Sequence, residues 1–337
     1  MRSIIILSAF FASAMPAFAY DKQALMESYF SVVMIRGYNQ TGGLAYGSGV
    51  VVGENKVITN CHVLRTTKQP WVARGQDSYT ITSVKADTWH DLCLVSTENL
   101  PFKPVRIGSS ATLKRGQEVA GIGHSNGSPA PLTSTGNVNG LYPEKPGNVI
   151  RTNAKFLMGA SGSGLFDMDG YLVGINTFKT AGTGGSIHFA LPVEWLASLE
   201  KLPEIKTFPI TGKALWEEDE DKKPFYMQAA VPESRSDWVA LRQVATKWAK
   251  AEPKSPDAWY ALGVSQENLG NIDLATEHYL QSSSLDENNM DVLIKIGDLA
   301  KNRGDKAEVN RVHAAITKID QDIGAQYQTF VDCTATC

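Results

Sequence analysis

The sequence predicts a protein of two domains, an all-β domain followed by an all-α domain built from helical repeats. Between Ser28 and Ile210, short β-forming runs are separated by glycine-rich turns at intervals of roughly ten residues. From Ser234 onward, apolar residues recur instead with the period of about 3.6 residues that is typical of helices. A chain of 337 residues is long enough for each domain to bury a core of its own.

The β-forming runs of the first domain are four to seven residues long and rich in valine, isoleucine and leucine. Clear examples cover residues 29–35, 49–52, 56–59, 92–95, 118–122 and 187–191. Many short strands at regular spacing are typical of a barrel or a sandwich. The segment 192–199 then has helical spacing, with a proline at its start where a helix tolerates one, and we expect this helix to close the domain.

An acidic segment separates the two domains. Residues 217–221 are all acidic, and two lysines and Pro224 follow them. A charge run of this kind is typical of a solvated linker rather than of an acidic binding tail. We therefore expect residues 20–205 to form the β domain and residues 206–232 to form a linker.

The helical part repeats itself after 34 residues: Leu262-Gly263 returns as Ile296-Gly297, and the turn around Gly270 returns 34 residues later. This period and the spacing of aromatic and small residues resemble the tetratricopeptide (TPR) family. The residues that carry the resemblance in the first full copy are Trp259, Leu262, Gly263, Gly270, Ala275 and Tyr279.

We expect TPR-like repeats over residues 233–325 and a C-terminal tail over residues 326–337. The repeats would amount to about two and a half copies, with residues 238–251 as the second helix of an incomplete earlier copy. The alternative is an unrelated helical bundle.

The first 19 residues predict a secretory signal peptide. They combine Arg2, an apolar stretch over residues 4–11 and the sequence Ala17-Phe18-Ala19, which fits the small-residue cleavage rule. Cleavage would leave an exported protein, periplasmic or secreted, and a retained membrane anchor is the alternative. No later segment reaches the ~18 continuous apolar residues that a membrane span requires.

The composition narrows the classes of ligand. A net charge of −3 and a pI near 6.1 give no basic field that would support nucleic-acid binding. No Cys-x-x-Cys pair occurs and the histidines are scattered, so we expect no structural zinc site, no other metal and no cofactor. Four cysteines in an exported chain suit two disulfides.

The stretch of residues 159–166, Gly-Ala-Ser-Gly-Ser-Gly-Leu-Phe, predicts a site of acyl transfer. A serine between glycines can lift its hydroxyl out of a tight turn while backbone N–H groups converge beside it. The stretch holds two such serines, Ser161 and Ser163. An ordinary turn is the alternative, because small residues also fill turns without any function.

A candidate base and a candidate acid precede this stretch. His62 follows the β-forming run 56–59, and Asp91 opens the run 92–95. Together with Gly-Ser-Gly at residues 47–49 and the run 187–192, these motifs resemble, in their order, the trypsin-like peptidases of chymotrypsin fold. The resemblance covers roughly residues 28–200 and is strongest to the exported bacterial branch near the HtrA family, here without a PDZ domain.

The resemblance implies two β-barrels with a catalytic triad between them. His62 would be the general base, Asp91 the acid that orients it, and Ser161, ahead of Ser163, the nucleophile. The backbone N–H groups of Gly159 and Ser161 would form the oxyanion hole.

Two further residues fall on the primary specificity pocket of the resembling family. Lys155 lies six residues before Ser161, and His188 lies on the strand that walls the pocket. A cation and a hydrogen-bonding ring suit an acidic or amide side chain at P1, the substrate residue before the scissile bond. The alternative is that Lys155 points into solvent, as most lysines do.

The cysteines form an inner pair and a terminal pair. In the resembling fold, Cys61 and Cys93 lie on neighbouring strands beside His62 and Asp91, so we expect a disulfide that braces the dyad, with two buried free thiols as the alternative. Cys333 and Cys337 are close enough in sequence to bridge.

The sequence as a whole therefore predicts an exported serine endopeptidase, a hydrolase, whose TPR array recruits a protein partner or substrate. A catalytically silent pseudo-peptidase that acts as a TPR scaffold is the main alternative. An esterase that uses the same triad is a further one.

Overall fold

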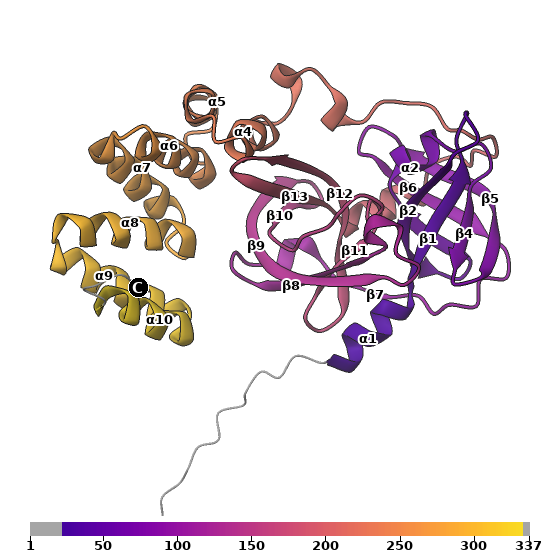
Figure 1. Ribbon diagram of the computed structural model, residues 1–337, viewed down its shortest axis with the longest axis horizontal. Coiled ribbons are helices and arrows are strands. Elements are labelled where there is room, and N and C mark those ends of the chain that lie inside the picture. Colours follow the sequence, from indigo (N-terminus) through magenta and orange to yellow (C-terminus); the bar gives the residue numbers. More distant parts are fainter. Residues whose placement is uncertain (1–21, 333–337) are drawn as a thin grey trace, which may run out of the picture.

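Two β-barrels and an array of helices follow one another along the chain in the computed structural model (Figure 1). The structure describes residues 22–332. The expected signal peptide and the pair Cys333 and Cys337 lie outside the described residues. Within residues 22–332, no helix has the length and the apolar character that crossing a membrane requires.

The first barrel closes in the strand order β1-β2-β3-β6-β5-β4. Its strands are β1 (Val32–Tyr38), β2 (Leu44–Gly53), β3 (Lys56–Thr59), β4 (Trp71–Arg74), β5 (Asp77–Asp87) and β6 (Leu92–Thr97), with helix α1 (Lys22–Phe30) before them and α2 (Cys61–Arg65) after β3. Residues of β1, β2 and β3 such as Val33, Val51 and Val57 point into its core. Asn55 takes φ +56 in the tight β2–β3 turn, a conformation that asparagine adopts more readily than most residues.

The second barrel runs in the order β11-β8-β9-β10-β13-β12 and is closed by the pairing of β11 with β12. Its strands are β8 (Glu118–Gly123), β9 (Leu132–Glu144), β10 (Gly147–Thr152), β11 (Gly164–Asp167), β12 (Tyr171–Gly182) and β13 (Gly185–Pro192). The short strand β7 (Arg106–Ile107) adds to β12 in parallel. Helix α3 (Leu196–Leu199) follows the barrel, as the sequence predicted for residues 192–199.

Seven α-helices follow α3 within the described residues. They are α4 (Phe225–Ser234), α5 (Trp238–Ala251), α6 (Pro256–Asn268), α7 (Ile272–Leu285), α8 (Met290–Arg303), α9 (Lys306–Ile319) and α10 (Gln321–Asp332). Side-chain oxygens cap several of their first turns, as Asp237 does for α5 and Asp305 for α9. Gly270 and Gly304, the pair that repeats in the sequence, both take a left-handed conformation at the turn that joins two helices.

The repeated glycines Gly263 and Gly297 allow close packing between helices. A Cβ atom at Gly263 would lie 2.4 Å from the Tyr279 ring, so α6 and α7 can approach only where no side chain intervenes. A Cβ atom at Gly297 would collide with the Tyr327 hydroxyl of α10. Both repeated glycines therefore lie where another helix packs closely, but the nearest partner is α7 for Gly263 and α10 for Gly297.

Two expected domain boundaries are wrong. The segment expected to be a linker, residues 206–232, contains most of helix α4. This apolar helix includes Pro232, and its burial against the second barrel stabilises it. The expected tail begins inside α10, which continues to Asp332 because Tyr327 packs on α8. The helical part therefore starts with a complete pair, α4 and α5, rather than with half of one.

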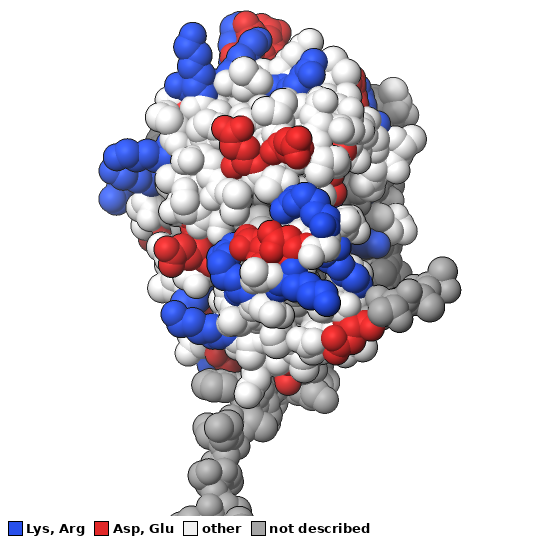
Figure 2. Space-filling model, turned by 90° about the vertical axis from the view of Figure 1, so that its left-hand side faces the viewer, with Lys and Arg blue, Asp and Glu red and all other residues white. Residues whose placement is uncertain are grey.

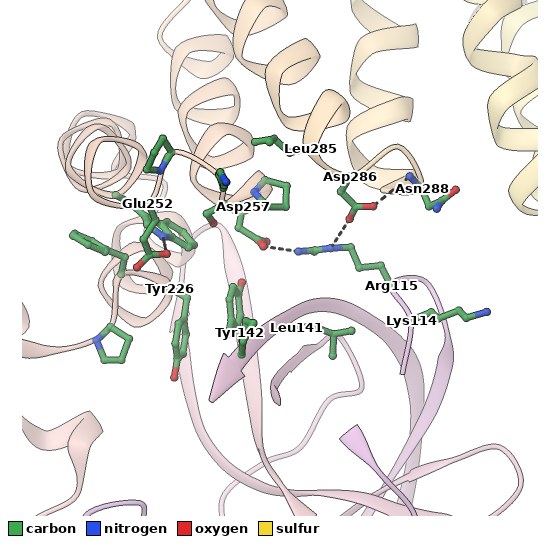
Figure 3. A pocket seen from close by; sticks show the side chains of 18 of the residues that line it. Lys114, Arg115, Leu141, Tyr142, Tyr226, Glu252, Asp257, Leu285, Asp286 and Asn288 are labelled. Atoms are coloured by element: carbon green, nitrogen blue, oxygen red, sulfur yellow. Dashed lines mark hydrogen bonds and ion pairs between the residues drawn. The ribbon is translucent and has the colours of Figure 1, made fainter. Parts of the chain in front are cut away.

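The helical array packs directly on the second barrel. The rings of Tyr142 in β9 and Tyr226 in α4 stack with centroids 4.3 Å apart and planes at 8°. Arg115 reaches across to Asp257 at 2.5 Å and to Asp286 at 3.3 Å, and these side chains line a cleft of about 1200 Å³ between barrel and helices (Figure 3). One hydrophobic core runs through this contact from the barrel into α6.

The face of the molecule formed by the helical array carries charges of both signs. Figure 2 shows lysines, arginines and acidic residues interspersed over this face, with uncharged surface between them. No single-sign patch that would attract a polyanion or a polycation stands out on this side of the molecule.

Candidate active site

His62 and Asp91 lie at the ends of two paired strands of the first barrel. Helix α2 follows β3 directly and carries His62, while Asp91 precedes β6. Strands β3 and β6 pair with Thr59 opposite Cys93, so both side chains come to the same end of the barrel. Cys61 and Cys93 form a disulfide beside them, with Cα atoms 5.1 Å apart.

Four donors hold the fully buried carboxylate of Asp91. Its Oδ1 accepts the backbone N–H of His62 at 2.8 Å, and its Oδ2 lies 2.6 Å from Nδ1 of the same ring. Oδ2 also accepts the Thr177 hydroxyl at 3.0 Å and the Trp216 indole N–H at 3.2 Å. Because Nδ1 faces a carboxylate, it holds a proton, and Nε2 keeps its lone pair free to accept another.

The backbone at Asp91 is held in an uncommon conformation. Its φ of +58° lies in the left-handed region, which residues other than glycine adopt seldom. The Asn60 side chain donates to the Asp91 carbonyl at 2.9 Å, and Cys61 N–H donates to the same carbonyl at 3.2 Å. The turn is thus fixed by the residues that immediately precede His62, as is common where a functional site stores strain.

Ser161 lies in the loop between β10 and β11 and is partly exposed. Its carbonyl accepts the backbone N–H of Ser48 at 2.8 Å, which ties the loop to the first barrel. Gly162 takes φ +84 and packs so tightly that a Cβ atom there would lie 2.4 Å from the hydroxyl of Thr59 and 2.9 Å from Asn60 N. The loop therefore lies against the turn that leads into His62.

The two serines of the loop differ in their surroundings. Ser163 is buried, and its hydroxyl accepts a hydrogen bond from the Asn176 side chain at 2.9 Å. The Ser161 hydroxyl has no hydrogen-bond partner within residues 22–332. Of the two, Ser161 is the one with an accessible side chain.

The backbone N–H groups of Gly159 and Ser161 differ from those of their neighbours Ala160, Gly162 and Ser163. Ala160, Gly162 and Ser163 donate to carbonyl oxygens, whereas Gly159 and Ser161 donate to none in the described part of the chain. The Met158 carbonyl accepts Asn126 N–H at 2.6 Å, and the Ala160 carbonyl accepts Ser163 N–H at 2.9 Å. Because a trans peptide points its N–H away from its carbonyl, the N–H groups of Gly159 and Ser161 point away from Asn126 N and Ser163 N, respectively.

The two expected pocket residues differ in their exposure. His188 is buried on β13, and its ring lies 4.7 Å from that of Phe156. Burial, and then the charges of Lys179 and Lys155, lower the pKa of His188 to about 4, so the ring is neutral at neutral pH. Lys155 itself is exposed.

Trp216 and Thr177 are site residues that the sequence did not reveal. Thr177 lies on β12, and Trp216 lies beyond the barrels in a short 3₁₀ turn over Leu215–Glu217. A groove of about 340 Å³ opens between them, and further lining comes from His62, Phe178, Lys179, Thr180, Lys223, Met227 and Val231. A lone tryptophan just before an acidic run carries no periodic signal, so only the folded chain shows its role. Within residues 22–332, no cluster of three or more side chains is arranged to hold a metal ion.

Comparisons with known proteins agree with this architecture. Residues 47–175 match the family model described as a trypsin-like peptidase domain. A probable periplasmic serine endoprotease DegP-like of Buchnera aphidicola is 31% identical over 166 residues, which cover 46% of this chain and 34% of that protein. The periplasmic serine endoprotease DegP of Escherichia coli is 31% identical over 175 residues, which cover 48% of this chain and 36% of that protein.

The chain thus spans about a third of the length of these relatives. A crystal structure of a protease from M. tuberculosis in its active form aligns with a TM-score of 0.50 at 22% identity, covering 62% of this chain and 99% of that one. This likeness confirms the fold that the motifs implied, two six-stranded barrels of the chymotrypsin type followed by helices. The chain contains a trypsin-like peptidase domain with DegP-like homologues.

Proposed function

We propose that the protein is an exported serine endopeptidase that cleaves peptide bonds with Ser161, His62 and Asp91. The observation that carries the proposal is the His62–Asp91 pair at the end of the first barrel, in which His62 donates twice to the Asp91 carboxylate and Thr177 and Trp216 add two further donors. The loop that carries Ser161, with the N–H groups of Gly159 and Ser161 bound to no acceptor in the described residues, packs against the turn that leads into His62.

In the proposed reaction, the Ser161 hydroxyl attacks the carbonyl carbon of the scissile bond while Nε2 of His62 takes its proton. The negative charge that develops on the carbonyl oxygen is stabilised by the N–H groups of Gly159 and Ser161. His62 then gives its proton to the leaving amine as the C–N bond breaks, and water, activated by the same ring, hydrolyses the acyl-enzyme. Asp91 keeps the ring in the required tautomer and stabilises its charged form.

We propose a preference for acidic or amide P1 side chains. The support is the combination of an exposed lysine, Lys155, with His188 on the neighbouring strand. A neutral imidazole offers a hydrogen bond without the desolvation cost of a buried charge. A peptide-library profile that shows cleavage after arginine or leucine would contradict this preference.

We propose that the helical array is a TPR-like module that recruits a protein partner or substrate. The 34-residue repeat and the close helix packing at both Gly263 and Gly297 support it. Helix α7 also presents partly exposed apolar side chains, Leu274 at 45% and Leu280 at 44%. Affinity capture by the Ser161→Ala protein, compared with the same protein carrying Leu274→Asp and Leu280→Asp, tests this role: equal capture by both would contradict it.

Export to the periplasm is part of the proposal, and it rests on the N-terminal motif and on the periplasmic homologues. N-terminal sequencing of the protein from a cell-envelope fraction tests it. A start at Tyr20 is the expected result, whereas an intact Met1 in the cytoplasmic fraction would contradict it.

Labelling by a fluorophosphonate tests the catalytic assignment. The wild type and Ser163→Ala should react, while Ser161→Ala and His62→Ala should not. A folded wild type without any labelling would favour the other candidate function, a pseudo-peptidase that acts as a scaffold. Labelling with hydrolysis of esters but not of peptides would favour an esterase.

A further inference from the structure

Trp216 connects the candidate active site to the segment that leads away from the barrels. It lies 125 residues after Asp91, in the chain that crosses from the first barrel to helix α4 (Figure 1). Its indole N–H donates to Oδ2 of Asp91 at 3.2 Å. Its ring meets that of His62 edge to face, with centroids 5.5 Å apart and planes at 90°.

The Asp91 carboxylate depends on donors from three parts of the chain. Oδ2 is contacted by His62 from α2, by Thr177 from β12 and by Trp216. A fully buried carboxylate needs such donors, because each missing hydrogen bond leaves negative charge without solvation. The indole is therefore one of the groups that hold this carboxylate against the His62 ring.

The segment around Trp216 is anchored independently of the indole. The backbone N–H of Leu215 donates to the carbonyl of Trp89, two residues before Asp91, at 2.8 Å. Arg65, on the same helix as His62, donates to the Gly212 carbonyl at 2.9 Å and to the Glu217 carboxylate at 2.6 Å. A substitution confined to the Trp216 ring therefore leaves these anchors in place.

Trp216 also forms a wall of the groove beside His62. Residues 177–180 of β12 also line this groove. Met227 and Val231 of helix α4 line it as well. The groove is therefore lined both by a barrel strand and by residues that follow both barrels in the chain.

We propose that Trp216 is a positioning residue of the peptidase, and that residues 212–231 belong to its active site rather than to a passive linker. The indole N–H holds the Asp91 carboxylate against His62. The ring and the start of α4 bound the groove in which an extended peptide lies along β12. The proposal rests on the proposed peptidase function and deepens it.

Two substitutions separate the two roles of the indole. Trp216→Phe keeps an aromatic wall but removes the N–H, so it should lower kcat about tenfold and leave KM within about twofold. Trp216→Ala removes the wall as well, so it should lower kcat and also raise KM. Trp259→Phe is the matched control, because the Trp259 indole donates to the Pro253 carbonyl within the helical array, far along the chain from the site.

A spectroscopic readout separates positioning from a general loss of structure. Proton NMR of the His62 Nδ1–H, assigned by its absence in His62→Ala, should show a shifted resonance in Trp216→Phe and an unchanged one in Trp259→Phe. A Trp216→Phe protein with wild-type kcat and an unshifted resonance would overturn the proposal. A wild type that fails to react with a fluorophosphonate contradicts the peptidase function instead, and the NMR shift still decides whether Trp216 positions the pair.

Discussion

Arg65 and Glu217 join the helix that carries His62 to the segment that carries Trp216, with 2.6 Å between Nη1 and Oε2. Glu217 also accepts the backbone N–H of Ala214 at 2.8 Å. Burial opposes the ionisation of Glu217, but these hydrogen bonds outweigh it and hold the pKa of the carboxyl below its ordinary value. The ion pair therefore favours the docked segment whenever Glu217 is charged.

Glu217→Gln should weaken the docking of this segment at neutral pH and make no difference in strong acid. Because the folded-state pKa of Glu217 is lowered, its contribution is complete above the ordinary carboxyl range and is lost as pH falls through the lowered value. For an accessible pair we expect about 0.5–1 kcal/mol at pH 7. Thermal unfolding of wild type and variant at pH 7 and about pH 3 checks this, with Asp219→Asn as a surface control.

If the unfolding temperatures of the wild type and Glu217→Gln differ by the same amount at both pH values, the role given to the charged Glu217 carboxylate is contradicted. The Asp219 carboxylate is 69% exposed in its pair with Lys222, so its removal should matter little at either pH.

Gly159→Ala should reduce acylation much more than it reduces stability. Gly159 takes φ +90, and a Cβ atom there would lie 2.5 Å from the Tyr46 ring and 2.7 Å from the His124 carbonyl, so the loop has to shift. Losing one oxyanion donor costs about 10²-fold or more in kcat. Steady-state kinetics on a peptide, with thermal unfolding in parallel, measures both effects.

Gly116→Ala is the matched control for Gly159→Ala. Gly116 has φ +76, and nothing lies within 4 Å of the position that its Cβ would take. Its substitution strains the backbone by about 1 kcal/mol without touching the nucleophile loop. Equal activity of the two variants would argue against Gly159 as an oxyanion donor.

Glu233→Ala should destabilise the contact between the helical array and the second barrel. Arg151 of β10 makes two parallel hydrogen bonds to the Glu233 carboxylate, at 2.9 and 2.6 Å, and each side chain is only 23% exposed. Burial opposes the charge of Arg151, but Glu233 outweighs it and raises the pKa of the guanidinium.

Without Glu233, the guanidinium would stay largely buried and unpaired, so we expect a loss of about 2–3 kcal/mol. Chemical denaturation measures it. Arg311→Ala, which removes an exposed pair on α9, serves as the control and should cost less than about 0.5 kcal/mol. An equal loss of unfolding free energy in Glu233→Ala and Arg311→Ala would show that the Arg151–Glu233 contact does not stabilise the packing of the helical array on the second barrel.

The double-barrel fold could be predicted because its signals are local and ordered along the chain. Apolar runs of strand length, separated by turns, predict the strands of the barrels. The motifs around His62, Asp91 and Ser161 follow one another in the order that the resembling family has. The 34-residue repeat likewise marks the helices from α6 to α9, because each repeat buries the same face.

The contribution of the linker could not be predicted in this way. Helix α4 is apolar around much of its circumference and contains Pro232, so it shows no amphipathic period. The Trp216–Asp91 hydrogen bond joins residues 125 apart, and nothing in the local sequence specifies such a contact. The acidic residues that follow Trp216 dominate the composition of the segment, so the sequence gives no sign that this tryptophan packs inward.

His188 should make the protein less stable as the pH falls from about 6.5 to 4. Burial, together with the charges of Lys179 and Lys155, lowers the pKa of His188 to about 4, whereas a histidine in the unfolded chain titrates near its ordinary value of about 6.5. Between these values the unfolded chain takes up a proton that the folded protein excludes, so unfolding becomes more favourable as the pH falls. The full effect is at most about 3.5 kcal/mol, from ~1.4 kcal/mol for each pKa unit.

His188→Gln removes this titration and should therefore lose less stability than the wild type between pH 7 and about pH 4.5. The comparison isolates one group, because His124, whose pKa is also lowered by burial, is present in both proteins and cancels. Thermal unfolding at closely spaced pH values is the measurement, and parallel curves for the two proteins would contradict the assignment.

The same variant tests substrate specificity. If His188 contacts the P1 side chain, His188→Gln should change the preference between glutamate and glutamine at pH 7. The native ring is neutral at this pH, so the substitution alters only its hydrogen bonding.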